Sequence, residues 1–209
     1  MKDNPFTTLV VGDIGVNCYL VPGPQSGNLY IIDPGGDAAD IIDAAANFKY
    51  KEAVILLTHA HVDHIGACGA VARKLDVEKV CLNAADKEMY SSPENHLLPY
   101  LPPAKNLPPV TDYYPQEDFS VIETPGHTPG SVCLWFKDYN TLFTGDTLFQ
   151  GSVGRTDLPG GDYDSLMRSI KEKLMVLPDD LRIFPGHQYW STIGTEKQRN
   201  PYLVRLLRS

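Results

Sequence analysis

A short histidine-rich stretch at residues 58–66 constrains this chain more than any other feature, because four potential metal ligands fall within six residues. These four are His59, His61, Asp63 and His64. The continuously apolar run at 53–57 before them is typical of a buried strand, and the run at 65–75 after them predicts a helix. From an extended loop the first two can point the same way, while the last two turn aside as the helix starts. One anchored loop can thus supply two adjacent ions; the alternative is a histidine cluster that only caps the helix.

Three more side chains of the ligand type follow predicted strands in the second half of the chain, in loops that glycine and proline hold tight. They are His127, Asp146 and His187. Seven ligands are too many for one tetrahedral zinc ion, and they suit two ions bridged by a carboxylate and a water molecule. Imidazoles and carboxylates without cysteine favour zinc, with iron or manganese as alternatives. Two such ions lower the pKa of a bridging water and stabilise a developing oxyanion, which is the design of a hydrolase.

The alternation of β-rich runs and helical patterns predicts an α/β protein that forms one domain over residues 1–209. Strands are predicted at 6–11, 17–21, 29–32, 53–57, 80–82, 119–123, 131–136, 141–144 and 181–184. Helices are predicted at 38–48, 65–75, 84–91, 163–176 and near the C-terminus. We expect the first three strands to form an antiparallel meander. The whole chain is expected to form two mainly antiparallel sheets with helices outside them, a four-layer α/β/β/α sandwich.

Charge and apolar content exclude two classes of partner. The formal net charge is -8 at pH 7, so we expect no nucleic acid bound on a basic surface. We expect no membrane contact and a cytoplasmic location, because no apolar run reaches spanning length and the N-terminus lacks the apolar core of a signal peptide. The four cysteines lie apart in apolar segments, so they are predicted to be reduced core residues. The sequence indicates no particular oligomeric state.

Two features leave alternatives open. Asp33, which follows the third predicted strand, is either a plain turn residue or a group that braces the histidine stretch. The segment at 93–115 contains seven prolines and several leucines and tyrosines. A loop of this length is either a lid that flanks the active site or an inert surface excursion.

Four motifs, in their order along the chain, resemble the metallo-β-lactamase superfamily. They are His59-x-His61-x-Asp63-His64, Gly126-His127-Thr128-Pro129-Gly130, Gly145-Asp146-Thr147 and Gly186-His187, and Asp33-Pro34-Gly35 also fits. The likeness covers essentially the whole chain. Within the superfamily, the chain looks most like the glyoxalase II branch, the hydroxyacylglutathione hydrolases, in its short single-domain bacterial form. The runs at 151–157 and 192–203 carry this finer likeness.

The resemblance implies a dinuclear centre with a defined set of ligands. One ion would be bound by His59, His61 and His127, and the other by Asp63, His64 and His187, with Asp146 as the bridge. A metal-bridging hydroxide would attack the carbonyl of a small-molecule thioester such as S-lactoylglutathione. The catalytic carboxylates would be Asp63, which also orients the hydroxide, and Asp146. A thiolate leaves readily, so no dedicated general acid is required.

The same resemblance suggests two residues that bind the substrate. Arg155 stands where larger glyoxalase II enzymes have a lysine that contacts glutathione, and Tyr189 matches a tyrosine that contacts it. The plainer alternatives are a surface salt bridge for Arg155 and a packed aromatic ring for Tyr189. The chain ends at Ser209, so we expect it to lack the C-terminal helical domain with which full-length members bind glutathione.

The main alternative is a persulfide dioxygenase, a related class that uses one iron ion. Its ligands here would be His59, His127 and Asp146, two histidines and a carboxylate as oxygen chemistry requires. A β-lactamase, an RNA-processing nuclease and a non-enzymatic binding module are further alternatives with less support. The acidic chain disfavours the nuclease, and the complete ligand set disfavours the binding module.

Overall fold

The computed structural model describes residues 4–97, 99 and 101–206. Its internal contacts divide the chain into two compact units, of which the first ends at Asp118 and the second begins at Phe119. Each unit is described below by itself. Leu98 and Tyr100 of the proline-rich segment lie outside the described residues. That residues 1–209 form a single domain stays a prediction.

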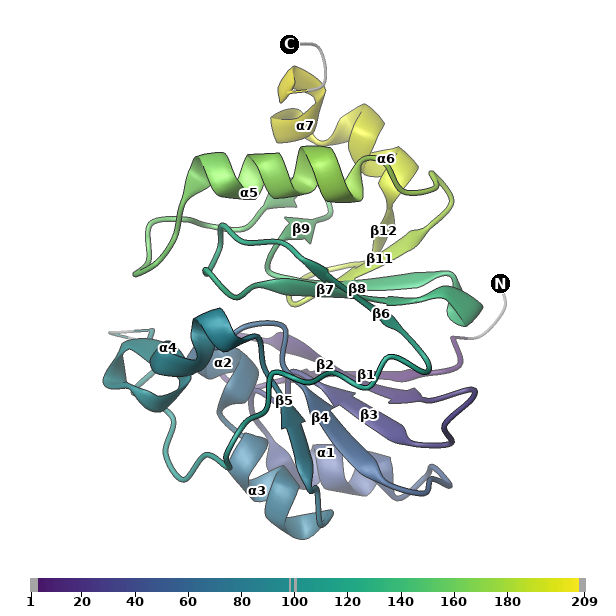
Figure 1. Ribbon diagram of the computed structural model, residues 1–209, viewed down its shortest axis with the longest axis vertical. Coiled ribbons are helices and arrows are strands. Elements are labelled where there is room, and N and C mark those ends of the chain that lie inside the picture. The colour runs from purple at the N-terminus through teal and green to yellow at the C-terminus, as the bar shows by residue number, and fades with distance from the viewer. Residues whose placement is uncertain (1–3, 98, 100, 207–209) are drawn as a thin grey trace. The chain divides into compact units, whose positions relative to one another are not determined.

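The first unit is built on a five-stranded sheet (Figure 1). Its strands, in spatial order, are β1 (Thr7–Val11), β2 (Val16–Pro22), β3 (Leu29–Ile32), β4 (Ala53–Leu56) and β5 (Lys79–Cys81). The first three form the predicted antiparallel meander. However, β3 pairs with β4 and β4 with β5 in parallel, so the expectation of a mainly antiparallel sheet is wrong for this unit. The cause is the helical connection after β3 and again after β4, since such crossovers return the chain in the same direction.

Helices of the first unit pack against this sheet (Figure 1). They are α1 (Ala38–Ala45), α2 (Val62–Ile65), α3 (Cys68–Lys74) and α4 (Lys87–Ser91), with 3₁₀ turns at Ala84–Asp86 and Pro93–Asn95. Fully buried Ile31, Ile41 and Ile55 belong to the core that joins sheet and helices. The predicted helix at 65–75 is divided at Gly66, because a neighbouring loop approaches it there: the Ala67 N–H donates to the Pro34 carbonyl (2.9 Å).

The second unit contains another five-stranded sheet, and here the mainly antiparallel expectation is right. Its order is β12 (Ser191–Thr192), β11 (Arg182–Pro185), β8 (Thr141–Gly145), β7 (Val132–Phe136) and β6 (Ser120–Glu123). Only the β8–β11 pair among them is parallel. Three short strands are not predicted from the sequence: β12 and the hairpin of β9 (Leu148–Phe149) and β10 (Ser152–Val153).

The helices of the second unit are α5 (Tyr163–Ser169), α6 (Ile193–Arg199) and α7 (Pro201–Leu206). A π-helical turn at Ile170–Leu174 continues α5, and a 3₁₀ turn lies at Lys137–Tyr139. Leu166, Ile170 and Leu174 face the core, as their spacing predicts. In the described part of the chain, no helix is long and apolar enough to cross a membrane. All four cysteines are buried and free, which confirms the prediction of reduced core residues.

Candidate metal centre

The parallel pairing of β3 and β4 explains where the histidine stretch begins. Ile32 pairs with Leu56, so both strands end at the same edge of the sheet. Asp33 therefore emerges from β3 beside Thr58, which follows β4. The two residues meet directly: an Asp33 oxygen accepts from the Thr58 N–H (2.8 Å), and the other oxygen accepts from the Thr58 hydroxyl (2.6 Å). Asp33 thus braces the histidine stretch, and its positive φ of 51° shows that it also makes a tight turn.

The Asp33 carboxylate also fixes the proton positions of two histidines. Its Oδ2 accepts from Nδ1 of His64 (2.9 Å), so Nε2 of that ring is the nitrogen that could bind a metal ion. The single hydroxyl proton of Thr58 is directed at Asp33, so the Thr58 oxygen accepts from Nδ1 of His59 (3.0 Å). In a neutral ring of either residue, Nε2 is then the nitrogen that carries no proton.

The four predicted ligands of the first unit lie together and are all buried. The ring of His59 lies 4.9 Å from that of His61 and 4.1 Å from that of His64, measured between centroids. Nε2 of His64 is 3.6 Å from Oδ2 of Asp63. The two histidines before α2 lie in extended chain, whereas Asp63 and His64 belong to its first turn, as the spacing predicts. We call these four residues the first ligand set.

A second ligand set, His127, Asp146 and His187, is gathered in the second unit. β8 and β11 run parallel, and Gly145 pairs with Pro185, so Asp146 and His187 leave the sheet at the same edge. Oδ2 of Asp146 lies 3.6 Å from Nε2 of His127 and 3.7 Å from Nε2 of His187. Nδ1 of His127 donates to the Arg155 carbonyl (2.7 Å), which can only accept, so in a neutral ring Nε2 is the nitrogen without a proton.

The spacing of these atoms fits metal coordination better than hydrogen bonding. A nitrogen–oxygen distance of 3.6 Å is too long for a hydrogen bond. Two ligands that each bind zinc at about 2.1 Å with a tetrahedral angle are about 3.4 Å apart. Neutral imidazoles with fixed tautomers and buried carboxylates are also the donor chemistry that zinc, iron and manganese accept. The residues of each set therefore fit divalent metal ions.

Two glycines let the ligand loops pack at distances that no other residue allows. A Cβ atom built on Gly35 would lie 1.4 Å from the Asp63 carbonyl oxygen. One built on Gly154 would lie 1.9 Å from the Asp146 carbonyl oxygen and 3.3 Å from Cβ of His127. The β9–β10 hairpin and the residues after it thus lie directly against the second ligand set. The sequence does not predict this role of Gly154, because a close approach between distant segments leaves no local pattern.

A buried carboxylate, Asp86, is a further support that the sequence does not predict. It is fully buried, and its Oδ2 accepts from the Ala60 N–H (3.1 Å), so it holds the backbone between the first two histidines of the first set. The sequence places Asp86 in a short polar helix, where acidic residues are commonly solvated. Asn83 caps the 3₁₀ helix that carries Asp86, since its side chain accepts from the Ala85 N–H, but this cap gives no sign of the contact with Ala60.

The two predicted substrate-binding side chains lie on the surface of the second unit. The guanidinium of Arg155 makes a bidentate pair with Asp157 (2.7 and 2.8 Å), which is the surface salt bridge that the sequence left open. This pair lowers the pKa of Asp157 to about 2. Tyr189 is 77% exposed and is therefore not a packed aromatic ring. Whether either residue contacts a substrate stays a prediction.

Comparison with known proteins identifies the family. The model of the metallo-β-lactamase superfamily matches residues 11–187. The hydroxyacylglutathione hydrolase GloC of Haemophilus influenzae is 37% identical over 201 residues, covering 90% of this chain and 92% of that protein. Among solved structures, BLEG-1, described as a B3 metallo-β-lactamase, is 36% identical with a TM-score of 0.84 and covers 95% of this chain and 99% of its own. TTHA1623, solved in a di-iron-bound form, is 33% identical with a TM-score of 0.80 and covers 94% and 100%.

These similarities extend over nearly the full length of each compared protein. They confirm the predicted α/β fold class of the metallo-β-lactamase type and the predicted likeness to hydroxyacylglutathione hydrolases. The motifs that carry the ligands all fall within the matched residues or at their end. The chain is a metal-binding hydrolase that belongs to the metallo-β-lactamase superfamily.

Proposed function

We propose that this chain hydrolyses a small-molecule thioester such as S-lactoylglutathione and uses two divalent metal ions for the reaction. Zinc is the metal we propose first. The first and second ligand sets supply the ligands, with His127 joining His59 and His61, and His187 joining Asp63 and His64, as the resemblance implies. The name of the Haemophilus influenzae relative, a hydroxyacylglutathione hydrolase, supports this substrate class. The di-iron form of TTHA1623 makes iron the metal to test beside zinc.

The position of Asp146 is the observation that carries the proposal. One carboxylate oxygen lies at nearly equal distances, 3.6 and 3.7 Å, from the Nε2 atoms of two histidines assigned to different ions. A carboxylate so placed can contact both ions at once. The one-iron centre of the dioxygenase alternative, with His59, His127 and Asp146 as its ligands, gives His187 no ligand role. The arrangement therefore favours a dinuclear hydrolase over the one-iron dioxygenase.

The reaction balances with water as the only co-reactant. Water supplies the oxygen of the new carboxylate, the carbon–sulfur bond breaks, the sulfur leaves as a thiolate, and the released protons pass to solvent. Two bound ions would supply an activated water and stabilise negative charge on the carbonyl oxygen. We assign Asp63 the further task of orienting the attacking water, because an ionised carboxylate only accepts hydrogen bonds. The thiolate needs no proton from the protein, since a thiol pKa is about 8.5.

Hydrogen bonds to the histidine rings set the tautomer and the orientation of these ligands before a metal ion binds. The Thr58 hydroxyl, the Asp33 carboxylate and the Arg155 carbonyl hold His59, His64 and His127 in the tautomer suited to metal binding. Such outer partners also raise the basicity of a ligating ring and keep its orientation. The side chains of Arg155 and Tyr189 are the proposed contacts for the thiol part of the substrate, and the guanidinium of Arg155 would contribute its charge to an anionic thiol.

Metal analysis followed by a substrate panel tests the proposal. Zinc-loaded and iron-loaded protein should each be offered S-lactoylglutathione, glutathione persulfide with an oxygen electrode, and nitrocefin as a β-lactam control. We expect two ions per chain and thioester hydrolysis at least a hundredfold faster than nitrocefin turnover. One iron per chain together with oxygen consumption on the persulfide would replace the hydrolase with the dioxygenase. Rapid nitrocefin turnover without thioester hydrolysis would favour a β-lactamase, the class that the name of BLEG-1 indicates.

A further inference from the structure

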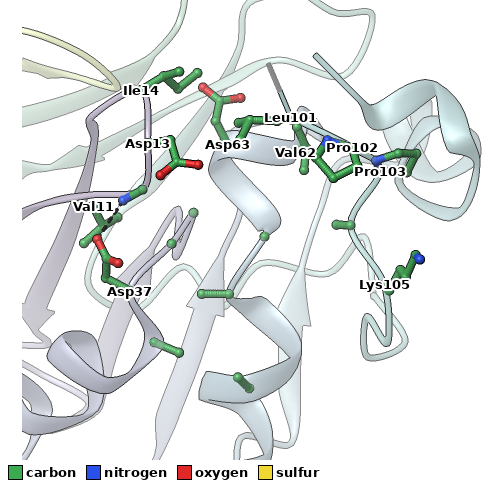
Figure 2. A pocket seen from close by; sticks show the side chains of 18 residues that line it. Val11, Asp13, Ile14, Asp37, Val62, Asp63, Leu101, Pro102, Pro103 and Lys105 are labelled. Atoms are coloured by element: carbon green, nitrogen blue, oxygen red, sulfur yellow. Dashed lines mark hydrogen bonds between the residues drawn. The ribbon is translucent and has the colours of Figure 1, made fainter. Parts of the chain in front are cut away.

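A cleft in the first unit reaches the predicted ligand Asp63. Its volume is about 640 Å³, within the usual range for sites that hold small molecules. Figure 2 shows the turn between β1 and β2, with Asp13 and Ile14, on one side of it. The segment Leu101–Lys105 lies on the other side, and Val62 and Asp63 lie between the two.

Apolar and small side chains form most of the cleft lining. They are Val11, Ile14, Ala38, Val62, Ala67, Ala70, Leu101, Pro102, Pro103 and Ala104, with glycines at 12, 35, 36 and 66. Glycine and alanine leave open space, and valine, leucine and proline offer apolar contact without hydrogen bonds. A lining of this kind favours a ligand that is itself apolar and extended.

The proline-rich wall is tied to the rest of the first unit. The Ala104 N–H donates to the buried Asn95 side chain (3.0 Å), and Leu97 and Leu101 exchange backbone hydrogen bonds (3.0 and 2.9 Å). Ala104 and Leu107 also pack against the core. This part of the 93–115 segment is therefore a fixed wall of the cleft, and not an inert surface excursion.

The charges around the cleft, apart from the predicted metal ligand Asp63, select against an anionic ligand. Asp13 and Asp37 line it, against one cation, Lys105. The Asp37 carboxylate accepts from the Gly12 N–H (2.8 Å), which holds it on the β1–β2 side (Figure 2). Lys105 is exposed on the opposite wall. The carboxylates of a thiol such as glutathione would meet like charges in this cleft, whereas a neutral chain would not.

We propose that this cleft binds the acyl chain of the substrate, and that the preferred substrates are thioesters of neutral aliphatic acids longer than lactate. The inference rests on the proposed thioesterase function and deepens it. Asp63 marks the end of the cleft at which the carbonyl reacts, and the hydrocarbon chain extends from there between the β1–β2 turn and Leu101–Lys105. The chemistry of hydrolysis is unchanged; only the acyl group is specified.

The rate as a function of acyl length tests this assignment. The zinc-loaded protein should be assayed with acetyl, butanoyl, hexanoyl and octanoyl thioesters of both glutathione and neutral N-acetylcysteamine. Each fully buried methylene raises kcat/KM about fourfold, and each half-buried one about twofold. From acetyl to hexanoyl, a difference of four methylenes, we expect kcat/KM to rise about 16- to 250-fold with either thiol. A change below twofold would overturn the inference while leaving thioester hydrolysis in place.

A single substitution at Ala70, a half-buried residue that belongs to neither ligand set, should block the cleft. Ala70 lines the cleft from α3, so Ala70→Phe should place a ring in it. The expected result is that hexanoyl thioester turnover falls to the acetyl level, so that the chain-length dependence is lost. Ala46→Phe, on the exposed end of α1, is the matched control and should leave the dependence intact. A dependence that survives Ala70→Phe would place the acyl chain elsewhere.

A binding measurement separates this inference from the proposed function. Calorimetry with S-octyl and S-methyl thioethers of N-acetylcysteamine, which cannot be hydrolysed, reports on the cleft without turnover. We expect the octyl compound to bind at least tenfold more tightly, and Ala70→Phe to remove that difference. If no thioester is hydrolysed but this difference is found, the proposed function fails and the apolar cleft stands. Equal binding of the two thioethers would refute the cleft assignment whatever the turnover.

Discussion

Replacement of Asp33 by asparagine isolates what the buried carboxylate does for the first ligand set. Asp33 is 1% exposed and accepts three hydrogen bonds, from the Thr58 N–H, the Thr58 hydroxyl and Nδ1 of His64. Its φ of 51° lies in the left-handed region, which asparagine adopts as readily as aspartate, so the substitution does not disturb the backbone. The amide keeps one oxygen and turns an N–H group toward at least one of the three donors.

Two consequences can be given magnitudes. A buried donor left without its acceptor costs about 1–3 kcal/mol of unfolding free energy, which corresponds to about 2–12 °C in the melting temperature of a chain this long. Loss of an outer partner of a metal-binding histidine weakens metal affinity about 10- to 100-fold. Both the lost hydrogen bond and the weaker metal affinity lower the stability of the zinc-bound protein. The zinc-bound protein should therefore lose more thermal stability than the metal-free protein.

Competition with a chromogenic chelator measures the zinc affinity, and calorimetry with and without zinc measures the stability. Asp76→Asn is the matched control, since Asp76 is exposed and has a similar φ of 53°. It should leave both quantities unchanged. A zinc affinity of Asp33→Asn within twofold of wild type would refute the argument that Asp33 sets the tautomers of His59 and His64.

Three more predictions concern other parts of the chain. Gly154→Ala should lower the free energy of unfolding by on the order of 3 kcal/mol or more and weaken metal binding, because its Cβ would lie 1.9 Å from the Asp146 carbonyl oxygen. Gly151→Ala is the control: Gly151 has a φ of +68° but open space around it, so this variant should lose only about 1 kcal/mol. Equal losses of unfolding free energy in chemical denaturation would contradict this prediction. Arg155→Ala should raise KM for S-lactoylglutathione more than it lowers kcat, and an unchanged KM would remove Arg155 from the substrate site. The thiols should resist a disulfide reagent at pH 8 until urea unfolds the chain, because burial raises the pKa of Cys68 and Cys81 to about 12; fast labelling of native protein would contradict their burial.

The sequence indicated the clustered histidines and carboxylates better than it indicated the residues that support them. Ligand residues are recognisable by type and by their position after strands, so His127, Asp146 and His187 could be named from the sequence alone. The direction of β4 and β5 could not, because an apolar run looks the same in parallel and antiparallel sheets. That direction is what brings Asp33 beside Thr58.

Long-range backbone contacts account for the remaining differences. The break at Gly66 depends on the Pro34 carbonyl, which is distant in sequence, and the role of Gly154 depends on its approach to Asp146 and to the more distant His127. Asp86 has the sequence surroundings of a solvated residue, and only its bond to the Ala60 N–H reveals its role. Local patterns indicate which residues carry the chemistry, whereas the residues that hold them in place depend on which segments meet.

The metal content of the Asp146→Ala variant tests the central claim most directly. Wild-type protein and variant, both dialysed against the same buffered zinc, should be compared by mass spectrometry of bound metal and by S-lactoylglutathione hydrolysis. We predict two zinc ions per chain in the wild type, and in the variant the loss of both ions or the collapse of turnover, since one carboxylate serves both ions. A variant that keeps two ions and full turnover would contradict the bridging role of Asp146 and the dinuclear mechanism with it.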